Sequence, residues 1–263
     1  MTSTLTTVFD RLRRDGRGGL VTYLTAGDPD AERSAALLVD VARAGADVLE
    51  VGVPFSDPLA DGPVIQRASE RALAAGMSLK GVLQVVRRVR EQVDTPIVLF
   101  TYANPVIRMD PVAFARAAAD AGVDGVLILD YPIEEAEPLR APILDAGLDP
   151  IFLISPTTSD ERIRKSSALG KGFLYVISRL GVTGMRDTLP DDVTDLMERV
   201  RRSSELPVAL GFGISRPEHV AEVWKVADAA VVGSALVNVV AEHGASPQLC
   251  ERASEYVRWL KNS

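Results

Sequence analysis

Short apolar runs rich in β-branched residues recur along the chain, and each is followed by a turn and a longer stretch with apolar residues at helical spacing. Runs of this kind, bounded by turn residues, are typical of strands buried on both faces. Eight are present, at residues 20–24, 48–52, 97–101, 125–129, 150–154, 172–176, 208–210 and 229–232. The pattern predicts eight strands that alternate with helices.

The predicted helices begin at recognisable signals. Asp28-Pro29 and Asp110-Pro111 each place a side-chain acceptor before a proline, whose missing N–H costs nothing in a first helical turn. We therefore expect these aspartates to cap the helices that follow. After Asp28, apolar residues continue at helical spacing as far as Gly45, which can end the helix. A further short helix is expected at residues 5–14, before the first strand.

Eight strand–helix units in 263 residues give about 33 residues per unit, which is typical of a (β/α)8 or TIM barrel. The alternative is an open, doubly wound sheet, which often carries GxGxxG after its first strand. Here that strand is followed by Thr25-Ala26-Gly27-Asp28, which does not match. Because no low-complexity linker divides the chain, we predict a single barrel domain over residues 1–263 with an extra N-terminal helix.

The composition narrows the functional class. The net charge of −7 argues against nucleic-acid or anionic-membrane partners, which are bound through Lys/Arg patches. The single cysteine, Cys250, allows no disulfide framework. No stretch approaches 18 uninterrupted apolar residues, and no secretory signal is present at the N-terminus. We expect a soluble, cytoplasmic protein.

Glycine-bearing turns follow the last three strands. Barrel active sites lie at the carboxyl ends of the strands, and phosphate is often held by the turns after strands 7 and 8. Those turns are Gly211-Phe212-Gly213-Ile214-Ser215 and Gly233-Ser234-Ala235, each leading into a helix, and Gly181-Val182-Thr183-Gly184 follows strand 6. Glycine lets backbone N–H groups approach phosphate oxygens, so the adjacent pair predicts a phosphate-ester ligand.

Few reactive side chains remain at the predicted strand ends. None of the five lysines falls there, so a Schiff base has no candidate residue. Both histidines, His219 and His243, lie in helical or post-helical segments, and no His/Asp/Glu set at strand ends predicts a metal site. The remaining candidates for reactive groups at the mouth of the barrel are two carboxylates, Glu50 and Asp61.

Glu50 interrupts the apolar second strand. Alternation along that strand turns Leu49 and Val51 toward the helices and Glu50 into the barrel interior. Burial there should raise its pKa and suit it to proton transfer near neutrality. The alternative is a structural glutamate paired to arginine or to backbone N–H groups. Asp61 lies in a loop, where it could also be a solvated turn residue or a helix N-cap.

The residues around these carboxylates resemble a known family. GVPFSDPLADGPVIQ at 52–66, with Glu50 two residues ahead of it, resembles the signature of the tryptophan synthase α subunit. Further motifs match in the same order: YLTAGDPD at 23–30, TYANPV at 101–106, SRLGVTGMR at 178–186, GFGIS at 211–215 and VVGSALV at 231–237. Two departures are Tyr131, where leucine is usual, and Met109-Asp110, where Tyr-Gly is common.

The resemblance implies a lyase that cleaves indole-3-glycerol phosphate to indole and glyceraldehyde 3-phosphate without a cofactor in this chain. It also implies a β-subunit partner that carries pyridoxal phosphate and receives the indole, in an α-β-β-α tetramer. By matching position, Glu50 shuttles protons and Asp61 contacts the indole N–H. The other implied site residues are Tyr23, Phe100, Tyr175 and Phe212 in the indole and glycerol pocket, Thr183 closing onto the aspartate, and Gly184, Gly213, Gly233 and Ser234 around the phosphate.

This mechanism agrees with the residues themselves. Without lysine or metal, a retro-aldol cleavage needs an electron sink in the substrate, and an indole protonated at C3 is one. Two rivals stay open: a stand-alone lyase that releases free indole, and a mainly allosteric subunit that binds the phosphate ester. A sugar-phosphate isomerase is less favoured, because no histidine or lysine electrophile stands at a strand end.

Overall fold

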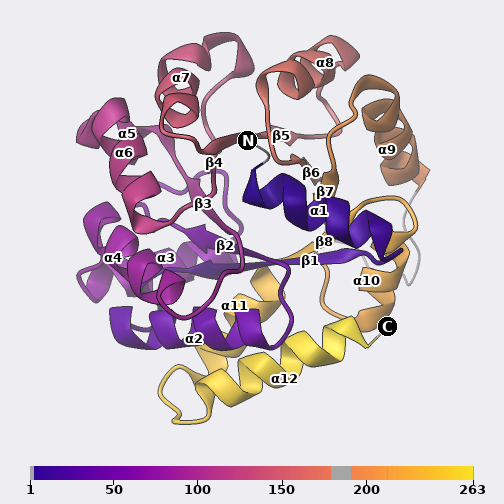
Figure 1. Cartoon of the computed structure of the whole chain (residues 1–263). Coiled ribbons are helices and arrows are strands. Elements are labelled where there is room, and N and C mark those ends of the chain that lie inside the picture. Colours follow the sequence, from indigo (N-terminus) through magenta and orange to yellow (C-terminus); the bar gives the residue numbers. More distant parts are fainter. Residues whose placement is uncertain (1–2, 179–190, 212, 263) are drawn as a thin grey trace.

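The computed structural model describes residues 3–178, 191–211 and 213–262. Its parallel strands close into a barrel in chain order, with β8 paired to β1 (Figure 1). The strands are β1 Gly19–Thr25, β2 Val48–Gly52, β3 Ile97–Thr101, β4 Gly125–Ile128, β5 Asp149–Ile154, β6 Leu174–Ile177, β7 Val208–Gly211 and β8 Ala229–Val232. The predicted (β/α)8 barrel is confirmed. The assignment of residues 1–263 to one domain stays a prediction.

The predicted strand bounds for β2, β3 and β8 agree with the structure, whereas β6 begins two residues later than predicted. The helices are α1 Thr4–Arg14, α2 Ala31–Arg43, α3 Pro63–Ala74, α4 Leu79–Arg90, α5 Ala103–Met109, α6 Pro111–Ala121, the 3-10 turn η1 Ile133–Glu135, α7 Glu137–Asp145, α8 Asp160–Leu169, α9 Asp191–Ser203, α10 Pro217–Trp224, α11 Ser234–His243 and α12 Leu249–Lys261.

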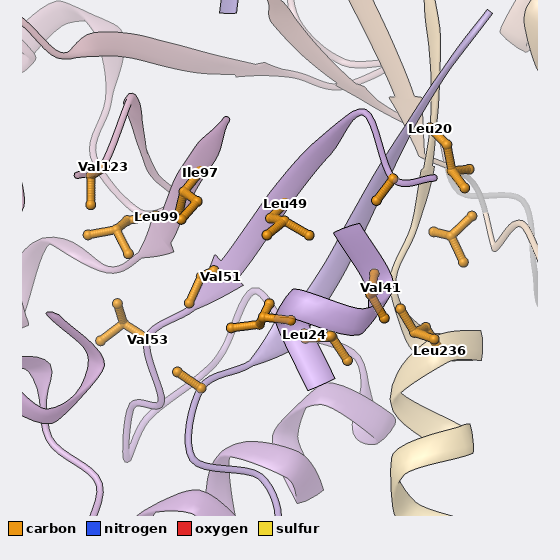
Figure 2. Close-up of a cluster of buried hydrophobic side chains, with 14 of the residues drawn as sticks. Leu20, Leu24, Val41, Leu49, Val51, Val53, Ile97, Leu99, Val123 and Leu236 are labelled. Atoms are coloured by element: carbon orange, nitrogen blue, oxygen red, sulfur yellow. The ribbon is translucent and has the colours of Figure 1, made fainter. Parts of the chain in front are cut away.

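Two apolar layers hold the barrel together. In the outer layer, Leu49 and Val51 of β2 pack with Leu20, Val41 and other residues between the strands and the helices (Figure 2). In the inner layer, the side chains at the intervening strand positions, Val48 among them, point inward and fill the lumen. This is the predicted alternation, and it places Glu50 inside the barrel.

The N-terminal helix α1 lies across the amino-terminal end of the barrel (Figure 1). Its buried face, which includes Leu5 and Phe9, belongs to the lumen cluster, and the Phe9 and Phe173 ring centroids are 5.4 Å apart. The hydroxyl of Ser3 caps the helix by accepting from the N–H of Thr6 at 3.2 Å. The predicted helix at 5–14 is therefore confirmed, and it closes the end of the barrel opposite the expected site.

One of the two predicted caps is wrong. Asp110 caps α6 as expected, accepting from the N–H groups of Val112 and Ala113. The cap of α2 is Asp30 rather than Asp28. Asp28 is buried and accepts two hydrogen bonds from Arg71, at 2.8 and 2.7 Å. The buried Asp28 carboxylate would be destabilising without a cation, so it binds Arg71 instead of the helix end. Asp30, two residues later, caps α2 in its place.

Aspartates also stand immediately before three of the strands, at positions 47, 124 and 228. Each accepts the backbone N–H of a residue at the start of the preceding strand; the pairs are Asp47 with Leu20 (2.9 Å), Asp124 with Ile97 (2.8 Å) and Asp228 with Val208 (2.8 Å). These bonds tie neighbouring strands together at the amino-terminal end of the barrel.

Candidate active site

Glu50 lies in the upper lumen, on β2 in register with Tyr23 of β1 and Val98 of β3. Its residue is 1% exposed, and within the described part of the chain neither carboxylate oxygen has a hydrogen-bond partner. Burial, and then the charge of Asp61, raise the pKa of Glu50 to about 8. The alternative of a structural pair finds no cation or N–H group here among the residues that the structure describes.

Aromatic rings line the lumen beside Glu50. The Tyr23 ring meets Phe100 edge-on, with centroids 5.1 Å apart, and Phe100 lies 6.4 Å from Tyr175. All three are buried. A side chain at Gly52 would place its Cβ 2.1 Å from the Tyr23 hydroxyl, so glycine is needed for this ring to fit. The structure thus brings together the three described residues predicted to line the indole pocket.

Asp61 lies in the loop between β2 and α3, one residue before the N-cap of α3. Gly62, not Asp61, is the N-cap of α3, so the capping alternative is wrong. Instead, Asp61 Oδ2 accepts from the Tyr102 hydroxyl at 3.0 Å. Burial raises the pKa of Asp61 to about 6, while the Tyr102 hydrogen bond lowers it. Near neutrality the Asp61 carboxyl group is thus mainly ionised and that of Glu50 mainly protonated, so Asp61 can stabilise a positive charge and Glu50 can donate a proton.

Part of the predicted phosphate cradle lies at the ends of β7 and β8, which are neighbours in the barrel. Gly213 has a φ of +77°, which favours glycine. Gly233 is the N-cap of α11 without a side-chain bond, and Ser234 is the first helical residue. The amides of this first turn are thus not capped by the Gly233 position and are suited to an anion. The remaining predicted residues, Thr183, Gly184 and Phe212, lie outside the described residues.

A profile of the tryptophan synthase alpha chain family matches residues 9–263. The chain belongs to this family. The alpha chain of Solibacter usitatus is 46% identical over 97% of this chain and 95% of its own length, and that of Phenylobacterium zucineum is 51% identical over 89% and 85%. Among solved structures, tryptophan synthase subunit alpha from Legionella pneumophila superposes with a TM-score of 0.92 at 35% identity, covering 100% of this chain and 98% of that one.

Membership of the tryptophan synthase alpha chain family confirms the resemblance and the enzyme class predicted from the motifs, a lyase of tryptophan biosynthesis. The ranges that the structure describes contain no helix long and apolar enough to cross a membrane. They also contain no group of three or more His, Cys, Asp or Glu side chains placed to hold a metal ion.

The sequence patterns did not single out Tyr102 as a site residue. Its hydroxyl donates to Asp61 and accepts from the N–H of Ala60 at 3.1 Å, and its ring lies 5.0 Å from that of Phe55. Burial, and then Asp61, raise the pKa of Tyr102, which keeps the phenol protonated as a donor. A signal was available, because Tyr102 directly follows β3 and therefore stands at the mouth of the barrel.

Proposed function

We propose that this chain cleaves indole-3-glycerol phosphate to indole and glyceraldehyde 3-phosphate, with Glu50 and Asp61 as catalytic residues and no cofactor of its own. The observation that carries the proposal is Glu50: a buried carboxyl group without a described partner, beside aromatic rings. A carboxyl group held this way costs stability, and that cost is explained if a substrate supplies the missing partners.

In this mechanism, protonated Glu50 donates its proton to C3 of the indole. The ring then carries a positive charge at its nitrogen, and ionised Asp61 stabilises it. The Glu50 carboxylate next accepts the proton of the glycerol hydroxyl, the carbon–carbon bond breaks, and its electron pair returns to the ring. The products are neutral indole and an aldehyde, and Glu50 regains its proton, so one residue serves as acid and then as base.

The rest of the substrate has matching surroundings. The rings of Tyr23, Phe100 and Tyr175 lie beside one another in the lumen and form an aromatic surface suited to an indole. We propose that Gly213, Gly233 and Ser234, with Gly184, bind the phosphate through backbone N–H groups and the amino-terminal end of α11. In the same proposal, Phe212 lines the pocket and Thr183 contacts Asp61.

The proposed partner is a β subunit that carries pyridoxal phosphate and receives the indole. The β2–α3 loop supports this, since its Leu59 is 93% exposed. Two more exposed apolar side chains, Ile107 of α5 and Val112 of α6, follow β3, the next strand of the barrel. A solved relative from Pyrococcus furiosus belongs to a tryptophan synthase a2b2 complex, 37% identical over 94% of this chain with a TM-score of 0.86. We propose the same α-β-β-α assembly here, in the cytoplasm.

A partner that binds the β2–α3 loop would affect Asp61 through a small number of hydrogen bonds. Tyr102 contacts both Ala60 and Asp61, and Gln66 Nε2 donates to the carbonyls of Pro58 and Asp61, at 3.3 and 2.9 Å. A partner that moves Leu59 therefore moves the backbone on which Asp61 stands. Partner binding should raise turnover, and substrate should tighten partner binding by the same factor that the partner tightens substrate binding.

The test is indole release from indole-3-glycerol phosphate, measured with and without a β subunit from the same organism. We expect slow release by the chain alone and a rise on adding the partner. Full activity of the chain by itself, with no rise in indole release on adding the β subunit, would favour the stand-alone lyase. Tight binding of glycerol phosphate without indole release in either condition would favour the mainly allosteric subunit.

A further inference from the structure

The loop after β7 is held by side chains that come from outside it. Residues 213–215 belong to no helix or strand, so their backbone lacks a regular ladder of hydrogen bonds. The carbonyl of Ser215 accepts from the Tyr256 hydroxyl of α12 at 2.8 Å. The N–H of Ser215 donates to Nδ1 of His219, in α10, at 3.4 Å. Two surrounding helices therefore supply partners for both backbone groups of Ser215.

Tyr256 is well placed to act as a fixed donor. It packs against the main apolar core, and its neighbours Ala253 and Val257 are fully buried in α12. Its ring also lies 5.6 Å from that of Trp259. Burial raises the pKa of Tyr256 to about 12, so the hydroxyl stays protonated. An apolar ring with a polar tip suits this position, because the ring packs on the core while the hydroxyl reaches the loop.

The bonded carbonyl is close to the proposed phosphate cradle. Ile214, almost fully buried, is the only residue between Ser215 and Gly213. With Ile214 fixed in the core and Ser215 bonded on both sides, the backbone at Gly213 has little freedom. Loop amides bind an anion tightly only when their conformation is set before binding.

We propose that Tyr256 is a positioning residue for the phosphate cradle: it holds the Ser215 carbonyl and thereby fixes the backbone at Gly213 for the substrate's phosphate. The inference rests on the proposed function, because it takes Gly213 as a phosphate contact. It gives the C-terminal helix α12, which lies beside α10 (Figure 1), a role in substrate binding in addition to its role in packing.

The test compares Tyr256→Phe with Ser254→Ala. Both remove a hydroxyl of α12 that donates to a backbone carbonyl, but Ser254 bonds Asp40 of α2, at 3.3 Å, away from the phosphate loop. Phenylalanine keeps the ring and its packing, so the variant should fold. For Tyr256→Phe we expect the KM for indole-3-glycerol phosphate to rise about 2- to 10-fold, the usual worth of one hydrogen bond, with kcat changed less than about 2-fold. Ser254→Ala should leave both constants at wild-type values.

Calorimetric titration with glycerol 3-phosphate gives a second readout that needs no turnover. Its dissociation constant should rise by the same factor in Tyr256→Phe and stay unchanged in Ser254→Ala. Equal constants in Tyr256→Phe and wild type would overturn the inference, as would a fall in kcat at constant KM. Failure of the proposed function is a separate result, a wild-type chain that releases no indole.

Discussion

Three aspartates at the amino-terminal end of the barrel and the two carboxyl groups of the candidate active site lie in opposite circumstances. At the amino-terminal end, Asp47, Asp124 and Asp228 each accept a backbone N–H and pair with a cation; the cations are Lys261, Arg90, and Arg13 with Arg201. At the mouth, Glu50 has no described partner and Asp61 has one neutral phenol. The three aspartates therefore stabilise the barrel, whereas the carboxyl groups of Glu50 and Asp61 remain available for chemistry.

The difference is visible in the pKa values of the mouth pair. Burial raises the pKa of Glu50 to about 8 and that of Asp61 to about 6, because none of the described residues places a cation beside them to compensate for lost hydration. Since folding and catalysis make different demands, substitutions in these two groups of carboxylates should separate activity from stability. The following predictions test that separation, from the largest expected effect to the smallest.

Glu50→Gln should reduce indole release by about 10²–10⁴-fold, because the amide cannot give and take the proton. The shape of the site is kept, so binding of glycerol 3-phosphate, measured by calorimetry, should stay within a few-fold of wild type. A variant that retains more than about a tenth of the wild-type rate would remove Glu50 from the acid–base role.

The same substitution should change how stability depends on pH. The folded-state pKa of Glu50, about 8, lies above its ordinary value of 4.5, so the folded protein binds the proton more tightly than the unfolded chain. Wild-type stability must therefore fall between about pH 4.5 and pH 8 through this group, by roughly 3–5 kcal/mol.

Glu50→Gln has no such ionisation. Urea unfolding at pH 5 and pH 8 should show the variant gaining stability relative to wild type at the higher pH. Parallel pH dependence in the two proteins would show that Glu50 is not desolvated as the structure indicates.

Asp124→Ala should lower the free energy of unfolding by about 2–4 kcal/mol, because it leaves the Ile97 N–H and the Arg90 guanidinium without their shared acceptor. The specific rate of indole release by the folded variant should be close to wild type. Asp160→Ala, which removes the more exposed ion pair with Arg199, is the control and should cost less than about 1 kcal/mol. A large loss of activity in folded Asp124→Ala would break the separation between the two groups of carboxylates.

The pH profile of kcat/KM offers the smallest and most specific test. It should rise as Asp61 ionises near pH 6 and fall as Glu50 ionises near pH 8, since the mechanism needs the first charged and the second protonated. Tyr102→Phe removes a hydrogen bond that favours the Asp61 carboxylate, so the acid limb should move up by about one pH unit. The alkaline limb should stay in place; if both limbs moved together, Tyr102 would be acting on the whole site rather than on Asp61.

Much of this could be predicted from local patterns. Apolar runs and their spacing are enough for the eight strands, the α1 helix and the inward position of Glu50, because strand alternation is a local property of the chain. The motifs are enough for the family. The predicted cap of α2 was wrong, because a local pattern cannot distinguish Asp28 from Asp30 as the capping residue. The structure distinguishes them, since Arg71, 43 residues away from Asp28, binds Asp28.

Tertiary structure alone decided which carboxylates have partners. Nothing in the sequence near Asp61 indicates that the Tyr102 hydroxyl, 41 residues away, would bond it, or that Tyr256 would reach Ser215 across the same separation. These contacts depend on the positions that whole helices and loops occupy in the closed barrel. The sequence alone therefore determined the barrel, the family and the identity of the reactive groups, while the folded structure set their protonation, because a pKa depends on burial and on neighbours that are distant in the chain.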